Sequence, residues 1–217
     1  MAAMIKPVSQ QKRSTRTRQL IFDTAARLFA SKGFKATGVR DIADEAGVNQ
    51  ALLSYHFGGK GALYHAILAE AVDHAATLAE RAAIEQAEYP ERALVRVFAE
   101  ALSSRPHLAP MILREQLDPE QLLDPGSATK LLGFMELTER MLRAIPLRPG
   151  ARRFDPQIVH LICISPLIHF LIATRVREEA ARTAARPITT PSLEEFVETQ
   201  GDMLSHALRE NDARILN

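Results

Sequence analysis

Apolar residues recur every three or four positions along most of the chain, the spacing of one face of an α-helix. The first such segment covers residues 15–32, where Ile21, Ala25 and Leu28 mark the apolar face. It ends at Gly33, a residue type favoured directly after a helix. No segment shows the strict alternation of apolar and polar residues that is typical of a strand. The pattern therefore predicts an all-α protein.

Two short helices are predicted next, over residues 39–46 and 49–57. Thr37 is a candidate N-cap for the first, and Asn49 is a natural N-cap for the second. Gly47 provides the turn between them. Two short helices joined by a glycine-containing turn are typical of a helix-turn-helix, whose second helix enters the major groove of DNA.

The positions along this second helix separate an inner face from an outer one. Val48, Leu53 and Phe57 lie close together on the helical wheel and are expected to pack inward. The residues left on the outside suit contact with bases and phosphates, since they combine long polar, small and aromatic hydroxyl side chains. They are Gln50, Ala51, Ser54 and Tyr55.

Longer helices are predicted over the rest of the chain. Their ranges are residues 60–86, 90–104, 111–117, a segment after 126 up to 145, 156–184 and about 192–211. Asp155 is expected to cap the helix that opens at Pro156, and Ser192 with Glu195 is expected to form a capping box. Pro166 lies inside a predicted helix and should kink it.

Charge is distributed unevenly, although the whole chain has a net charge of only +1. Residues 1–60 carry ten Lys and Arg against four Asp and Glu, whereas the remainder carries 17 against 22. A basic module on an acidic body is typical of a protein whose one end meets a polyanion. A solvated tail would explain the charges of residues 6–18 equally well, but not the motif that follows them.

The composition is that of a soluble globular protein, with 47% hydrophobic and 24% charged residues. The apolar run over residues 158–174 is interrupted by polar residues and is therefore interpreted as a buried helix rather than a membrane span. Residues 9–18 are polar where a secretory signal would need an apolar segment. The single cysteine, Cys163, excludes an internal disulfide. We expect a cytoplasmic protein.

Residues 37–63, together with the preceding helix end at Phe29, Gly33 and Phe34, resemble the DNA-binding domain of TetR-family regulators. The resemblance implies two sets of contacts. It places near phosphates Thr37, Tyr55, His56 and Lys60, and near base edges Arg40, Gln50, Ala51, Leu52 and Ser54. The family often has Gly at the position of Ala51 and Tyr at that of Ser54, so base readout is expected to differ at these two positions. Gly61 replaces a usual Glu and removes an ion pair.

Residues 111–119 add a weaker similarity to a TetR subfamily that contains regulators of drug sensitivity and efflux. The resemblance implies a ligand-binding body whose last two long helices pair with those of a second copy in a four-helix bundle. Candidate ligand contacts are Met111, Arg114, Phe134, Met135, Cys163, His169 and Phe170. The apolar members fit a plain core equally well, and Arg114 fits an ion pair with Glu115, Asp118 or Glu120. Cys163 fits a small buried hydrophobe better than a redox sensor.

Metal and enzyme chemistry find little support. His65 and His74 are nine residues apart, as are His160 and His169, and this spacing puts each pair on opposite faces of a helix. There is no phosphate loop, dinucleotide fingerprint or nucleophile elbow, so neither a metal nor a cofactor is expected. A helical enzyme or adaptor that uses a cavity in the body is the alternative class, and it leaves the basic N-terminus unexplained.

The expected organisation has three parts: a basic flexible arm over residues 1–13, a three-helix DNA-binding domain over residues 14–59, and a helical ligand-binding and dimerisation domain over residues 60–217. The function expected from them is that of a ligand-responsive repressor. It would act as a homodimer on double-stranded DNA with a pseudo-palindromic site, and its effector would be a small apolar or amphipathic molecule.

Overall fold

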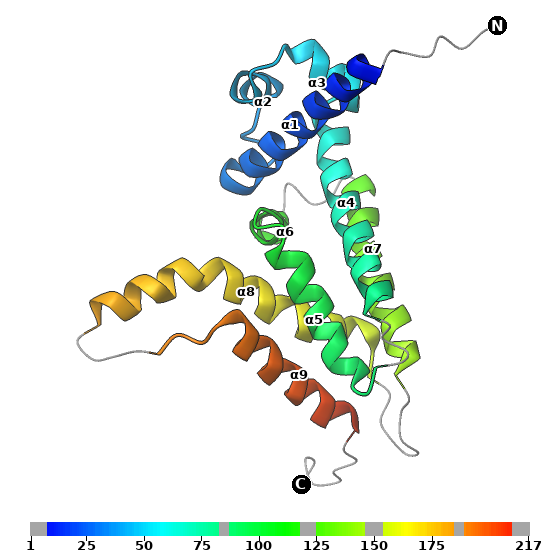
Figure 1. The fold of residues 1–217 in the computed structure, drawn as a ribbon. Helices are drawn as coiled ribbons and strands as arrows, with labels where there is room; N and C mark the ends of the chain where they lie inside the picture. Colours follow the sequence, from blue (N-terminus) through cyan, green and yellow to red (C-terminus); the bar gives the residue numbers. More distant parts are fainter. Residues whose placement is uncertain (1–7, 83–86, 118–124, 146–153, 185–188, 210–217) are drawn as a thin grey trace, which may run out of the picture.

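The computed structural model describes residues 8–82, 87–117, 125–145, 154–184 and 189–209, and these are helical or connecting segments without a strand. The prediction of an all-α fold is confirmed. The helices, shown in Figure 1, are α1 (Val8–Lys32), α2 (Val39–Ala46), α3 (Gln50–Phe57), α4 (Lys60–Arg81), α5 (Pro90–Ser103), α6 (Leu108–Leu117), α7 (Pro125–Ala144), α8 (Pro156–Thr183) and α9 (Leu193–Arg209).

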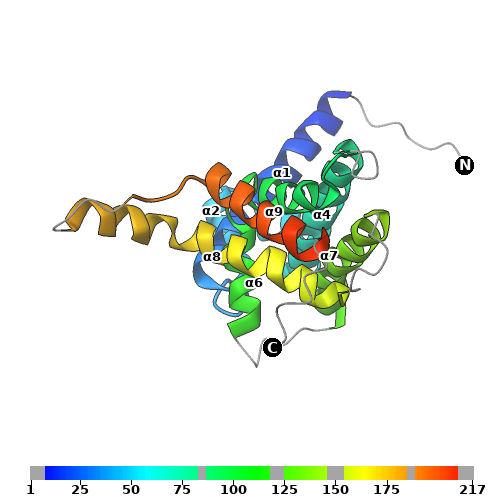
Figure 2. The ribbon, with the colours of Figure 1, turned by 90° about the horizontal axis from the view of Figure 1, so that it is seen from below.

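The helices form a small end and a larger body. Helices α1, α2 and α3 gather at one end of the molecule, and α4 leads from there into the body (Figure 1). In the body α7 lies along α4, while α5 packs against α4, α8 and α9. Helix α6 touches α1 and thereby joins the body to the small end a second time. Helix α9 lies at the end of the molecule away from α3 (Figure 1), and from below α8 and α9 lie in front of the other helices (Figure 2).

The N-terminal caps of α3, α8 and α9 are where the sequence places them. Asn49 accepts a hydrogen bond from the backbone N–H of Ala51 at 2.8 Å, and Asp155 accepts one from Gln157 at 2.7 Å. Ser192 and Glu195 form the predicted capping box, with N–H···O distances of 2.7 and 3.1 Å. Each cap satisfies backbone donors that the first turn of a helix cannot pair internally, so these starts are fixed locally.

Three helix boundaries differ from the prediction. Helix α1 begins at Val8 rather than at residue 15, because residues 8–14 contain no Gly or Pro and include good helix formers such as Gln, Lys and Arg. Residues 8–13 of the predicted flexible arm are therefore helical. Helix α6 begins at Leu108 and includes Pro110 in its first turn, where the missing N–H has no helical partner to lose. Helix α4 ends at Arg81.

The long apolar run in α8 is buried on one face only. Val159, Cys163 and Leu167 are enclosed, whereas Leu161 and Ile162 are 57% and 51% exposed. Residues 156–174 are long and apolar enough to cross a membrane by composition alone, yet 39% of that window is buried inside the protein. The prediction of a buried helix therefore holds for one face only, because α8 packs on the body with that face and leaves the other exposed.

Candidate nucleic-acid interface

Helix α3 is anchored by one fully buried side chain. Leu53 has no exposed surface, and Val48 and Phe57 pack against the same core from either side of it. Phe57 also lies 6.4 Å from the ring of Phe22 on α1, measured between ring centroids. The predicted inner face of this helix is confirmed. Burying it fixes the rotation of α3 about its axis.

That rotation turns the predicted contact residues outward. Tyr55 is 67% exposed, the largest exposed aromatic side chain of the small end, and its ring meets that of His56 edge to face at 5.1 Å between centroids. His56 is half-buried and Leu52 is 38% exposed. We call the exposed side of α3 the reading face, and it consists of Gln50, Ala51, Leu52, Ser54 and Tyr55.

Thr37 does not belong to this surface. Its side chain has no exposed area, and its hydroxyl donates to the carbonyl of Gly33 at 2.7 Å. The N-cap of α2 is Gly38, whose N–H is bonded instead by the Asp41 carboxylate at 2.8 Å. Both predictions for Thr37, the N-cap and the phosphate contact, are wrong for its side chain. The carbonyls at the end of α1 lack helical donors, and Thr37 supplies one.

Lys60 points toward the end of α1 as well. Its ammonium donates to the carbonyl of Phe34 at 2.9 Å and lies 4.2 Å from the centroid of the Phe34 ring. Partial burial lowers the pKa of Lys60 from its ordinary value. An ammonium has two further hydrogens to donate, so its predicted phosphate contact stays a prediction.

Arg40 extends from the exposed side of α2. It faces Asp44 one turn later at 3.5 Å, with 81% of the arginine side chain exposed. An ion pair this exposed contributes little to stability and can be exchanged for a phosphate. A second exposed pair, Arg27 with Glu45 at 2.9 Å, holds α1 against α2.

The N-terminal turns of α1 form a basic surface. The sequence predicted a flexible arm up to residue 13, whereas the structure is helical from Val8. Lys12, Arg13, Arg16 and Arg18 are exposed, and Arg18 places its guanidinium 4.7 Å from the centre of the Phe57 ring on α3. These turns project beyond the rest of the small end in both views (Figures 1 and 2). Residues 8–14 contain neither Gly nor Pro, and this is the signal in the sequence that predicts the extension.

Arg114 links the body to the small end. From α6 it donates Nε–H to the carbonyl of Ala30 at 2.9 Å and a terminal N–H to that of Ser31 at 2.7 Å. These bonds are neither the predicted ligand contact nor the predicted carboxylate pair, and Asp118, Glu120 and the side chain of Glu115 lie outside the described part of the chain. The last carbonyls of α1 have no helical donors, and a cation there also complements the helix dipole.

The other six predicted ligand residues lie in different surroundings. Met111, Phe134 and Cys163 are enclosed in the continuous core, and Phe170 is buried against Phe196 with ring centroids 4.4 Å apart. Met135 is half-buried, whereas His169 is exposed. The structure therefore does not gather them around one described cavity.

Cys163 and His160 are both buried groups of the body. Burial raises the pKa of the Cys163 thiol to about 12, so it is a small buried hydrophobe rather than a reactive thiolate. His160 lies 2.8 Å by Nδ1 from the hydroxyl of Thr138, and that hydroxyl donates to the carbonyl of Phe134 at 3.0 Å. Burial lowers the pKa of His160 to about 4, so this histidine is neutral.

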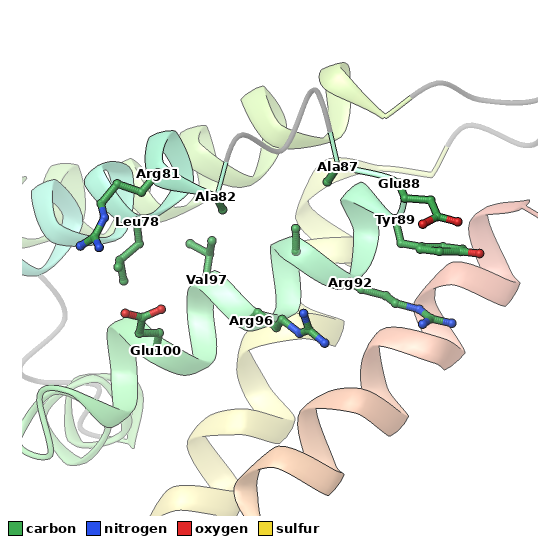
Figure 3. Close-up of a pocket in the computed structure, with 11 residues that line it drawn as sticks. Leu78, Arg81, Ala82, Ala87, Glu88, Tyr89, Arg92, Arg96, Val97 and Glu100 are labelled. Atoms are coloured by element: carbon green, nitrogen blue, oxygen red, sulfur yellow. The ribbon is translucent and has the colours of Figure 1, made fainter.

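A groove of about 560 Å³ runs between the end of α4 and α5 (Figure 3). Three arginines line it, but two of them are already paired with α9. Arg92 meets Asp202 at 2.8 Å, and Arg96 is bonded to Glu198. Two of the three cations of this groove are therefore already neutralised by carboxylates of α9.

A second groove, of about 390 Å³, lies between α8 and α9 and is lined almost entirely by carbon atoms. Its lining residues are Phe154, Val159, Ile162, Pro166, Phe196, Thr199, Gln200, Met203, Leu204, Ala207 and Leu208. Met203, at 69% exposure, lines it from α9, and Ile162 lines it from α8. Large exposed apolar side chains on adjacent helices are typical of an interaction surface.

Comparison with known proteins agrees with this geometry. Residues 21–67 match the family of bacterial regulatory proteins of the tetR type. The chain is 46% identical over 54 residues to the probable HTH-type transcriptional regulator YttP of Bacillus subtilis (strain 168), covering 25% of this chain and 26% of that one. It is 48% identical over 48 residues to the HTH-type transcriptional repressor KstR2 of Rhodococcus jostii (strain RHA1), covering 22% and 24%. Each match spans about a quarter of the relative.

The fold as a whole also has a solved counterpart. It is similar to the fatty acid degradation regulator FadR from Bacillus halodurans, with a TM-score of 0.65 and 18% identity, over 89% of this chain and 97% of that one. The class of protein is therefore a helix-turn-helix DNA-binding domain joined to a helical body. Over residues 21–67 the chain is therefore similar to the DNA-binding domain of the TetR family of bacterial transcriptional regulators.

Proposed function

We propose that this protein is a cytoplasmic transcriptional repressor that binds double-stranded DNA as a homodimer and responds to a small effector. The observation that carries the proposal is the reading face of α3. It is exposed along its length while Leu53 beneath it is fully buried, so the helix presents its polar side rigidly. Rigid presentation of a short helix is what insertion into the major groove requires.

Within this proposal Gln50 and Ser54 contact base edges, together with Arg40 from α2 and the smaller Ala51 and Leu52. Tyr55 and His56 contact phosphates. Base contacts set the sequence preference, whereas phosphate contacts position the protein. Ala51 offers only a methyl group, which suits an apolar contact such as the thymine methyl.

The basic turns of α1 contribute a further contact with the phosphate backbone. Lys12, Arg13 and Arg16 fall within an arc of about 100° on the helical wheel, since each residue turns the helix by that angle. An α-helix with its side chains is roughly 10–12 Å wide, whereas the minor groove is about 6 Å wide. A helical extension therefore follows the backbone and does not enter the minor groove as an extended arm would.

The partner copy is expected to cover the exposed face of α8 and α9. Ile158, Leu161, Ile162 and Met203 are each more than half exposed, although they are apolar. A twofold axis places the same patch on both copies, so one apolar face can cover the other. The dimer would then present two α3 helices to successive major grooves, about 34 Å apart.

The effector is expected to act through the body, and α6 is the element placed to relay it. Arg114 on α6 holds the end of α1, so a movement of α6 is transmitted to the DNA-binding domain. Met111 lies on the buried side of the same helix. A ligand shifts the equilibrium only if it prefers one of the two conformations. KstR2, named a repressor, and FadR, named for fatty acid degradation, support a repressor with an organic effector.

DNA binding is tested by electrophoretic mobility shift with duplex fragments that flank the gene, at several salt concentrations. Retardation should weaken as salt rises, because each phosphate contact releases counterions. Replacing Lys12, Arg13 and Arg16 together by alanine should flatten the dependence of log affinity on log salt by about 2–3, at roughly 0.9 per contact. Absence of retardation with every flanking fragment would refute the proposal.

A sequence-independent loss in the triple variant is the result expected for backbone contact. If the loss is instead confined to fragments with A·T-rich flanks, the extension reads the minor groove and the helical assignment of its contact is wrong. Lys32, on the last turn of the same helix, provides a matched control, since it is exposed but far from this basic surface.

Effector response is tested by a thermal-shift screen of apolar and amphipathic compounds, because a ligand of the folded state raises the melting temperature. A compound that releases DNA from the wild type should release it less from Arg114→Ala. The Arg105→Ala variant serves as the control, since the Arg105 guanidinium is bonded to Glu70 on α4 rather than to the carbonyls of α1.

A further inference from the structure

Helix α8 carries a proline at a position that breaks its backbone bonding. Pro166 lies ten residues inside a helix that continues to Thr183. Proline has no N–H, so the carbonyl of Ile162, four residues earlier, loses its helical donor. The proline ring also pushes that carbonyl outward. The neighbouring Cys163 is fully enclosed, so the freed carbonyl lies at the edge of the core.

A side chain of α9 supplies the missing donor. The amide Nε2 of Gln200 donates to the carbonyl of Ile162 at 2.7 Å and to that of Cys163 at 3.0 Å. Gln200 is itself buried, with 9% of its surface exposed. Both bonds join residues more than thirty positions apart in the chain, so they tie α9 directly to the broken turn of α8.

The tie lies in the apolar groove between the two helices. Ile162 and Pro166 line that groove from α8, and Gln200 lines it from α9 beside Met203. Apart from Thr199 the rest of the lining is apolar, so water competes weakly for the freed carbonyl of Ile162 and a protein donor there gains strength. The same groove belongs to the face that the second copy is proposed to cover.

We infer that Gln200 is the positioning residue for dimerisation: its amide replaces the backbone donor that Pro166 removes and so fixes α8 against α9 in the geometry that the partner copy recognises. This inference rests on the proposed homodimer. Without the amide, the carbonyl of Ile162 is left unsatisfied in an apolar groove and α8 bends differently. With an alanine at position 166, the helix satisfies that carbonyl itself and the amide is no longer needed.

A double-mutant cycle tests the inference on the full chain. The variants are Gln200→Met, Pro166→Ala and both together, compared by thermal melting at one protein concentration and by sedimentation equilibrium. Gln200→Met alone should lower the melting temperature by about 3–6 °C, the range expected for a buried polar group left unpaired in a chain of this length. It should also weaken the dimer about tenfold. In the Pro166→Ala background both effects should nearly disappear.

Two further variants separate the donor from the shape of the side chain. Gln200→Glu keeps the shape but sets a carboxylate against two carbonyls, so at neutral pH it should be at least as harmful as Gln200→Met. Thr77→Val, on α4 and outside this groove, removes a hydroxyl that bonds within its own helix, to the carbonyl of Asp73 at 2.9 Å, and should leave the dimer unchanged.

The outcomes distinguish the inference from the function on which it rests. Equal effects of Gln200→Met in both backgrounds would overturn the amide tie. A clear coupling in melting temperature with an unchanged dimer constant would overturn its role in dimerisation. A monomeric wild type would refute the proposed homodimer, whereas the melting cycle would still report whether the tie exists.

Discussion

The positions of side chains in the small end of this protein follow from the sequence, whereas those in the body do not. In α3, residues expected to face inward are buried and residues expected to face outward are exposed, as Leu53 and Tyr55 show. In the body, the residues expected to share a ligand site are divided between the core, as Phe134 is, and the surface, as His169 is. A face of one short helix is a local property, whereas a cavity is made by helices that are distant in sequence.

The two regions also differ in the chemistry of the face that each leaves exposed. The small end buries Leu53 beneath α3 and leaves the reading face of that helix exposed. The body buries one side of α8 and leaves an apolar side, with Leu161 at 57% exposure, free. Both ends thus keep one uncovered face, and the chemistry of each face indicates its partner: a polar and basic surface for DNA, and an apolar surface for a second copy.

The largest expected effect is on stability, at Phe134. Truncation by Phe134→Ala should lower the free energy of unfolding by about 3–5 kcal/mol, because the side chain is enclosed in the core and leaves a cavity. Urea denaturation followed by circular dichroism measures it. A loss below about 1 kcal/mol, together with altered effector binding, would instead place Phe134 in a ligand pocket. The predicted ligand residues of the body would then be partly correct, as the predicted faces of α3 are.

The second largest effect is expected in the pH dependence of stability, which His160 in the body should cause. The pKa of His160 falls from 6.5 to about 4 on burial, so the unfolded chain takes up the proton first as the pH drops. Stability is therefore fully present above pH 6.5 and is lost as the pH falls toward 4, by about 3 kcal/mol for this group.

Urea denaturation at pH 7 and pH 4.5 checks this prediction. The variant His160→Gln removes the titration, because it replaces the imidazole by a neutral amide. The pKa values of His74 and His107 are also lowered by burial, so they contribute loss of the same sign. The difference between wild type and variant isolates His160. An identical pH dependence in both proteins would show that His160 does not carry the effect.

Tyr55 should show the opposite behaviour to Phe134. Tyr55→Ala removes a side chain that is 67% exposed, so the free energy of unfolding should change by less than about 0.5 kcal/mol. DNA affinity should fall about tenfold or more, since a hydrogen bond to a charged group such as phosphate is worth about 1.5–3 kcal/mol. Fluorescence anisotropy with a retarded fragment measures it. Unchanged affinity would remove Tyr55 from the proposed contacts.

The smallest effect is expected at the contact between α1 and α2. Arg27→Ala breaks the pair with Glu45, whose side chains are 61% and 39% exposed. Solvent screens such a pair, so the loss should be less than about 1 kcal/mol and should vanish at high salt. A larger, salt-independent loss would mean that the small end depends on surface charge rather than on its buried anchor.

The sequence by itself determined the elements and the polarity of their faces. Helix periodicity, the caps at Asn49 and Asp155, the capping box at Ser192 and the inner face of α3 all follow from residues within one or two turns of each other. Such contacts form whatever the rest of the chain does, because the backbone geometry of a helix brings those residues together.

Only the tertiary structure decided what the remaining polar side chains do. Lys60 reaches Phe34, Arg114 reaches Ala30 and Gln200 reaches Ile162, across 26, 84 and 38 positions of the chain. In each case a backbone carbonyl near a helix end, or beside the proline of α8, accepts a hydrogen bond from a distant side chain. Backbone groups must be satisfied, yet the donor is whichever side chain the packing of helices brings near, and no local pattern records that choice.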